Sequence, residues 1–155
     1  MPLTHTRIAL KAGPLVVLLQ DRDAATDEQW AALMIDIKAA RTSLTATNNQ
    51  MFGLCISDGG APNARQRSSL SAAVDGMPFR AGVLSDSTIV RGAVTAMAWF
   101  NQGIRSFSPS EANKLFDHLG LNQADIGLIR RAISDMYKLV RVTTLVSVPS
   151  LLPNA

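Results

Sequence analysis

Residues 51–63 read MFGLCISDGGAPN, and this stretch decides the fold class. It begins with a short apolar run, ends that run at Asp58 and continues through a small polar loop towards a helical segment. The same pattern of apolar run and terminal aspartate occurs twice more, at 15–21 and at 81–86. Apolar runs of this length that alternate with helical periodicity are typical of buried strands. The chain is therefore predicted to fold as an α/β domain.

The segments on either side extend this alternation. A first strand is predicted at 6–11, and Gly13-Pro14 joins it so closely to the run at 15–19 that the two strands should be antiparallel. The later helices and strands have the approximate bounds 26–44, 51–56, 62–74, 79–84, 88–100, 104–107, 109–120 and 122–140. The prediction is a mixed sheet of about five strands packed with helices, in the order β-β-α-β-α-β-α-β-α-α.

Capping residues mark several helix boundaries. Thr26 is followed by two acidic residues and should cap the first helix, whereas Pro62 is predicted as the first helical residue of the second. Residues 108–111 have the pattern of a capping box with proline at the first helical position. Gly120 should end the helix that follows.

Composition limits the classes of protein to consider. With 155 residues, 47% hydrophobic and 17% charged, the chain is predicted to be one globular domain, with a core at about 6–140 and a tail at 141–155. Aromatic residues make up only 5%, and the basic residues that give the net charge of +3 are dispersed. Both features argue against a nucleic-acid partner.

Cysteine usage and hydropathy address the compartment. The single cysteine, Cys55, lies in an apolar run and is predicted to be a reduced, buried and inert thiol. No apolar run approaches the roughly 20 residues of a membrane span, and the first residues do not form a secretory signal. A cytoplasmic protein without a membrane span is expected.

The element order and the loop at Ser57–Gly60 resemble the STAS family, which includes anti-sigma-factor antagonists and the cytoplasmic domains of sulphate transporters. The resemblance covers roughly Thr6–Val140. In that family the loop carries Asp-Ser-Gly or Asp-Thr-Gly, and a partner kinase phosphorylates the hydroxyl. Here Asp58 matches the aspartate, but Gly59 stands at the phosphoacceptor position and Ser57 precedes the aspartate. This departure argues against a phosphorylation switch and leaves the STAS-like fold and a binding role as expectations.

A second likeness joins the loop to a later segment. Asp58–Pro62 together with Trp99–Asn101 is similar to bacterial proteins that have no assigned function. The likeness therefore implies no activity.

The favoured functional hypothesis is a non-enzymatic regulatory or protein-interaction module. Loops at the carboxyl ends of parallel strands are where ligands and partners usually contact such sheets. The candidate partner-binding residues are Ser57, Asp58, Gly59, Gly60, Asn63, Ser85, Asp86, Ser87 and Arg91. The exposed N–H groups of these loops, with close approach at Gly60, are also a candidate cradle for phosphate or another small ligand.

A small-ligand or metal-dependent enzyme is the first alternative. If the three strands are neighbours, Asp21, Asp58 and Asp86 are placed to share a Mg²⁺ ion, although aspartate at such positions more often caps helices and turns. His5 and His118 are predicted to lie far from these loops. No complete catalytic motif is present, the serines lack a nucleophile-elbow pattern, and no cofactor is assigned.

Self-assembly is the second alternative. The last helix carries an apolar stripe that is either core or a dimer face, formed by Ile126, Ile129, Ile133, Met136 and Val140. Trp99-Phe100 is likewise either buried or part of a partner-binding patch with Met97. The tail at 141–155 is expected to add a strand or to dock, either on its own domain or on another chain.

Overall fold

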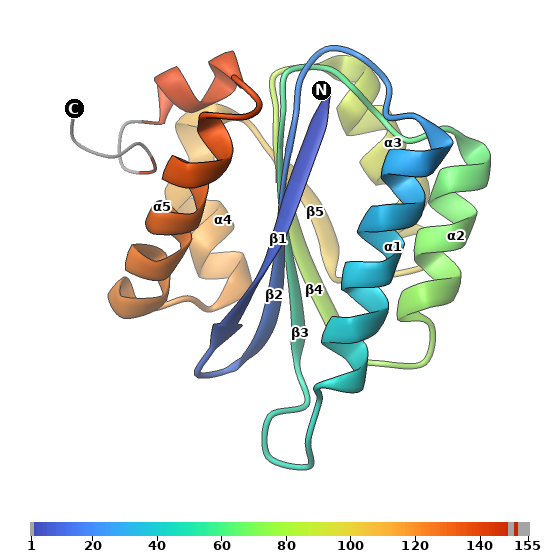
Figure 1. Cartoon of the computed structure of the whole chain (residues 1–155), viewed down its shortest axis with the longest axis vertical. Coiled ribbons are helices and arrows are strands. Elements are labelled where there is room, and N and C mark those ends of the chain that lie inside the picture. Colours follow the sequence, from blue (N-terminus) through green and yellow to red (C-terminus); the bar gives the residue numbers. More distant parts are fainter. Residues whose placement is uncertain (1, 149–150, 152–155) are drawn as a thin grey trace.

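A five-stranded mixed sheet forms the centre of the computed structural model, which describes residues 2–148 and 151 (Figure 1). Its strands follow one another in sequence order and are β1 (Leu3–Leu10), β2 (Gly13–Gln20), β3 (Met51–Ser57), β4 (Phe79–Leu84) and β5 (Ile104–Phe107). β1 is antiparallel to β2, and each later pair is parallel. The predicted α/β class, mixed sheet and element order are confirmed.

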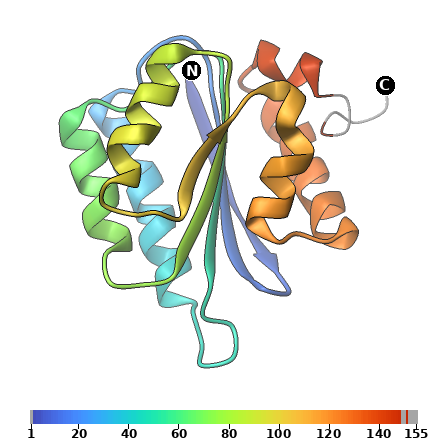
Figure 2. The same ribbon diagram turned by 180° about the vertical axis from the view of Figure 1, so that it is seen from behind.

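Helices cover both faces of the sheet (Figures 1 and 2). One layer consists of α1 (Asp27–Thr42), α2 (Ala64–Val74) and α3 (Thr88–Ala98). The other consists of α4 (Ala112–Leu119), α5 (Gln123–Tyr137) and the 3₁₀ turn η2 (Thr143–Ser147), with η1 (Pro109–Glu111) leading into α4. No helix in the described part of the chain is long and apolar enough to cross a membrane.

Strand alternation explains why the apolar runs are continuous. In β2, Leu15, Val17 and Leu19 pack with the α4–α5 layer, whereas Val16 and Leu18 pack with the α1–α3 layer. The same period of two divides the residues of β3 and β4 between the layers. Strands buried on both faces need apolar residues at every position, so they show no polar alternation.

Most of the predicted boundaries hold, and the exceptions have local causes. Thr26 caps α1 in a capping box with Gln29, and Gly120 ends α4 with a φ of +68°. Pro62, however, is not the first helical residue of α2. Asn63 is the N-cap, because its side chain accepts a hydrogen bond from the N–H of Gln66, and Pro62 precedes it.

Several element ends also differ from the prediction. β1 begins at Leu3 rather than at residue 6, because its pairing with β2 continues to Gln20. α3 ends at Ala98 and α5 at Tyr137, each before the predicted end.

The apolar stripe of α5 belongs to the core. Ile129 and Ile133 are fully buried, and Met136 and Val140 are nearly so. They pack against the sheet and against the C-terminal segment, in which Leu145 is also fully buried. Of the two predicted alternatives, core or dimer face, burial within the chain fits the core.

The C-terminal segment docks on its own domain. Residues 143–147 form η2 rather than a strand, at the end of the sheet where the parallel strands have their carboxyl ends (Figure 1). Val148 and Leu151 are buried beside it. The rest of the predicted tail, at 149–150 and 152–155, lies outside the described residues.

Candidate functional site

The Asp58 carboxylate holds the C-terminal segment in place. It accepts hydrogen bonds from the N–H groups of Thr143 (2.7 Å) and Thr144 (2.8 Å) and from the Thr144 hydroxyl (2.7 Å). Thr143 and Thr144 are the first two residues of η2, so Asp58 caps this short helix from a distant part of the chain. The residue predicted to recognise a partner is thus engaged within the fold.

The hydrogen bonds also control the charge on Asp58. Partial burial raises the pKa of this carboxyl, but the hydrogen bonds from Thr144 and Thr143 outweigh burial, so the pKa lies below its ordinary value of 3.8. The carboxylate is therefore ionised at neutral pH, which strengthens the hydrogen bonds that it accepts.

The rest of the β3–α2 loop is bound to the loop that follows β2. The N–H of Asp58 donates to the carbonyl of Gln20 (3.0 Å), and the N–H of Gly60 donates to the carbonyl of Asp21 (2.8 Å). Buried Ser57 donates its hydroxyl to the Gly60 carbonyl (2.8 Å) and accepts from the N–H of Gly59 (3.1 Å). The N–H groups of Asp58, Gly59 and Gly60, which were predicted to contribute to a phosphate cradle, are thus paired within the chain.

Gly60 has a different role from the one predicted. A Cβ at this position would lie 2.4 Å from the carbonyl oxygen of Asp23 and 2.5 Å from the side-chain nitrogen of Gln20. The absence of a side chain therefore allows two loops of this chain to approach one another, rather than allowing an external ligand to approach.

The β4–α3 loop is also ordered by its own polar groups. Ser87 is the N-cap of α3 and accepts a hydrogen bond from Val90 (3.3 Å), while buried Ser85 accepts from the N–H of Ser87 (3.1 Å). The Arg91 guanidinium donates to the Ser85 carbonyl (3.4 Å). Asp86 is exposed at the tip. Of the predicted site residues in this loop, Asp86 is the one that faces solvent.

The loops come together, but they do not assemble a metal site. A Cβ at Gly59 would be 3.9 Å from both Arg22 and the Ser87 hydroxyl, so the loops after β2, β3 and β4 meet there. Asp21 accepts from the N–H of Asp23 (2.8 Å), Asp58 is committed to η2, and no cluster of three metal-ligating residues occurs among the described residues. The hypothesis of a shared Mg²⁺ at Asp21, Asp58 and Asp86 is not supported.

The two histidines have partners elsewhere. His5 contacts Asp36 on α1, and the ring of His118 lies 2.8 Å from the Gly103 carbonyl oxygen. Neither ring contacts the candidate loops, as predicted.

The outward-facing surface of α3, next to the β4–α3 loop, is apolar and exposed. Ile89, in the first turn of α3, is 72% exposed. Trp99 and Phe100, which directly follow the last residue of the helix, are 84% and 82% exposed. Gly92 and Ala96 are exposed between them. At 100° per residue these five positions occupy one side of the helix, which we name the α3 outer face.

The α3 outer face carries no charge. Arg91 is the one charged residue in 88–100, and its guanidinium turns towards Ser85. Trp99 and Phe100 are not core residues, so the predicted alternative of a partner-binding patch is the one their exposure fits. Met97 does not join them, because it is buried on the inner side of the helix.

The sequence offered Trp99-Phe100 as a candidate patch but did not indicate that the patch continues along α3 to Ile89. Residues 88–98 are apolar or small on both sides of the helix, so periodicity does not indicate which side packs on the sheet. The available signal is the absence of charge over two helical turns on the side that faces solvent.

No family model, curated protein or solved structure matched this chain.

Proposed function

We propose that this chain is a non-enzymatic protein-interaction module of STAS-like type that docks through the α3 outer face. The observation that carries the proposal is the exposure of Trp99 and Phe100 beside Ile89 on a helix face without charges. Exposed aromatic residues grouped on one face are typical of protein interfaces. The order of strands and helices supports the STAS-like assignment.

The partner that best fits this face is a second copy of the chain. In an antiparallel pair of α3 helices, Ile89 of one copy lies opposite Trp99 and Phe100 of the other, and Gly92 and Ala96 meet at the crossing. Small residues at a crossing let two helices approach closely. Because the face is uncharged, two identical copies do not repel one another there.

The buried area is adequate for a weak dimer. Large aromatic side chains bury about 150–250 Å² each. Trp99 and Phe100 from two copies would therefore bury on the order of 600–1,000 Å², and with Ile89 the area lies in the range of weak complexes. Neighbouring atoms of the β4–α3 loop add to this area.

A cysteine at Ala96 tests the pairing directly. In an antiparallel pair, Ala96→Cys places two thiols close to the symmetry axis, and mild oxidation should give a disulfide-linked dimer. Burial raises the pKa of the native Cys55 thiol to about 12, so Cys55 should not compete. Asn113→Cys, on the exposed side of α4, is the matched control and should give much less cross-linked product.

Sedimentation equilibrium provides the thermodynamic test. Gly92→Gln should raise the dimer dissociation constant at least tenfold, since the new side chain blocks the crossing. The monomer should stay folded, because a Cβ at Gly92 has no neighbour within 4 Å. A wild-type protein that stays monomeric at every concentration, with no Ala96→Cys product, would overturn the pairing and leave a different protein as the occupant of this face.

A further inference from the structure

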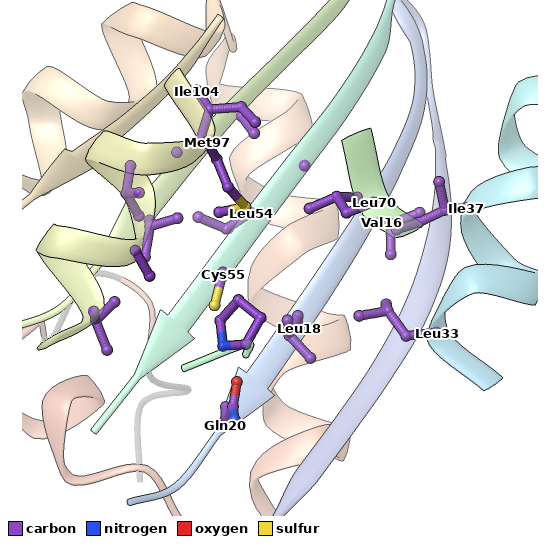
Figure 3. Close-up of a pocket in the computed structure, with 18 of the residues that line it drawn as sticks. Val16, Leu18, Gln20, Leu33, Ile37, Leu54, Cys55, Leu70, Met97 and Ile104 are labelled. Carbon is purple, nitrogen blue, oxygen red and sulfur yellow. The ribbon is translucent and has the colours of Figure 1, made fainter. Parts of the chain in front are cut away.

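A cavity of about 90 Å³ lies between the sheet and the α1–α3 layer (Figure 3). Its floor comes from β2, β3, β4 and β5, and its roof from α1, α2 and α3. The labelled residues around it are Val16, Leu18, Gln20, Leu33, Ile37, Leu54, Cys55, Leu70, Met97 and Ile104. The lining is almost entirely apolar, with Gln20 as its main polar side chain.

The cavity has a cause in the sequence. At the centre of its floor the strands carry small residues, Gly53 and Cys55 on β3 and Ala81 on β4. In its roof α2 contributes one lining side chain, Leu70. Leu70 and Cys55 keep some accessible surface although they lie between the layers, which shows that the space beside them is not filled.

One polar group points into this apolar space. Gln20 is only 2% exposed, and its amide nitrogen donates to the Asp23 carbonyl (3.2 Å). This bond directs the other end of the amide, the carbonyl oxygen, towards the interior of the pocket (Figure 3). None of the hydrogen bonds in the described part of the chain is donated to that oxygen.

The orientation of Gln20 is fixed by its surroundings. A Cβ at Gly60 would lie only 2.5 Å from the side-chain nitrogen of Gln20. The β3–α2 loop therefore packs tightly against the Gln20 amide. A ligand or water in the cavity can supply the donor that this oxygen lacks within the described chain. The apolar space next to the acceptor favours a molecule that is apolar apart from a single donor.

We propose that this cavity binds a small apolar molecule with one hydroxyl group, which donates its hydrogen bond to the Gln20 carbonyl oxygen. A cavity of about 150 Å³ accepts benzene, which has six non-hydrogen atoms, so a cavity of about 90 Å³ holds roughly three or four. The apolar part of the ligand lies along Leu18 and Cys55 towards Met97. The proposal is independent of the docking function of the α3 outer face.

Two probes of equal size test the site. Propan-1-ol has four non-hydrogen atoms and one donor, whereas methoxyethane has the same number of atoms and no donor. Each is titrated into the methyl-labelled chain and followed by NMR. Propan-1-ol should give saturable shifts of methyl groups that line the cavity, such as Leu18, Leu33 and Val94, and much smaller shifts of Leu119 and Ile129 in the other layer.

The comparison of the probes reports on the acceptor. One neutral hydrogen bond corresponds to roughly a 2- to 10-fold difference in affinity, so propan-1-ol should bind more tightly than the ether by that factor. Gln20→Met should remove this preference while keeping the apolar space.

Blocking variants report on the space. Cys55→Leu should fill the cavity and abolish saturable binding of both probes. Ala93→Val, from the roof, gives a second blocking variant if the first does not fold. Gly127→Ala is the control, since a Cβ there meets nothing within 4 Å and the position is far from the cavity lining. It should bind propan-1-ol like the unmodified chain.

Several results would overturn the proposal. Shifts that do not saturate, or that spread equally over both layers, would show that the cavity is not a binding site. Unchanged binding in a folded Cys55→Leu or Ala93→Val variant would show the same. Equal affinities for the alcohol and the ether would refute the role of Gln20.

Discussion

The two helical layers fill the space on the sheet to different degrees. In the α4–α5 layer, Leu115, Leu119, Ile129 and Ile133 are almost completely buried, as are the strand residues beneath them. In the α1–α3 layer, partly accessible Leu18, Cys55 and Leu70 surround a cavity of about 90 Å³. By the usual dependence on cavity volume, that space costs about 2 kcal/mol of stability relative to a filled core.

The difference separates structural from functional roles. The α4–α5 layer also holds the C-terminal segment, through Leu145 and the Asp58 hydrogen bonds, and so stabilises the fold. The α1–α3 layer carries both the cavity on the inner side of α3 and the apolar outer face on its outer side. A layer that is incompletely packed is the one able to accept a ligand.

Truncation of one large side chain in each layer should show the largest contrast. Ile133→Ala should lower the free energy of unfolding by roughly 4 kcal/mol, because the surrounding side chains leave a new cavity. The loss of unfolding free energy for Leu18→Ala should be at least about 1 kcal/mol smaller than the loss for Ile133→Ala, since Leu18 already borders empty space. Urea unfolding of both variants measures the difference, and equal losses would contradict the comparison.

Adding atoms should show the opposite asymmetry. A Cβ at Gly82 would lie 2.6 Å from the Leu115 Cγ atom, so Gly82→Ala should destabilise the protein by about 2 kcal/mol through overpacking. Cys55→Leu adds more atoms but places them in the cavity, and it should be neutral or stabilising. Thermal unfolding gives the ranking, and a larger loss for Cys55→Leu would show that the cavity is not available to side chains.

Removal of the Asp58 carboxylate tests the link between the β3–α2 loop and the closely packed layer. Asp58→Ala removes the acceptor of three hydrogen bonds and should cost roughly 1.5 kcal/mol. Asp86→Ala, at an exposed position in the neighbouring loop, should cost almost nothing. Hydrogen exchange of the Thr143 and Thr144 amides should accelerate in the first variant alone.

The smallest effect should be a dependence on acidic pH. The pKa of Asp58 is lower in the folded chain than its ordinary value of 3.8, so the ionised carboxylate stabilises the fold above that pH. Its contribution is lost as the pH falls below 3.8 and through the folded pKa. The stability difference between the unmodified chain and Asp58→Asn should therefore shrink on acidification. A difference that stays constant from pH 6 to pH 2 would contradict this assignment.

The local parts of the fold could be predicted from the sequence, and the site could be predicted only in part. Capping by Thr26, the end of α4 at Gly120 and the strand at 51–57 depend on residues close to one another in the chain. The partners of Asp58 are 85 and 86 residues away, so no local pattern identifies them. The sequence predicts that another group approaches the backbone at Gly60, but it does not identify that group as the loop after β2.

The sequence by itself determined the α/β class, the order of the elements and the burial of the parallel strands. These follow from apolar runs and capping residues, whose effects act over a few neighbouring positions. Only the tertiary structure decided which apolar surface is covered. The α5 stripe is buried while Trp99 and Phe100 remain exposed, although both are apolar in sequence. Burial depends on which elements meet across the sheet, and the space that small residues leave there appears only when the layers are assembled.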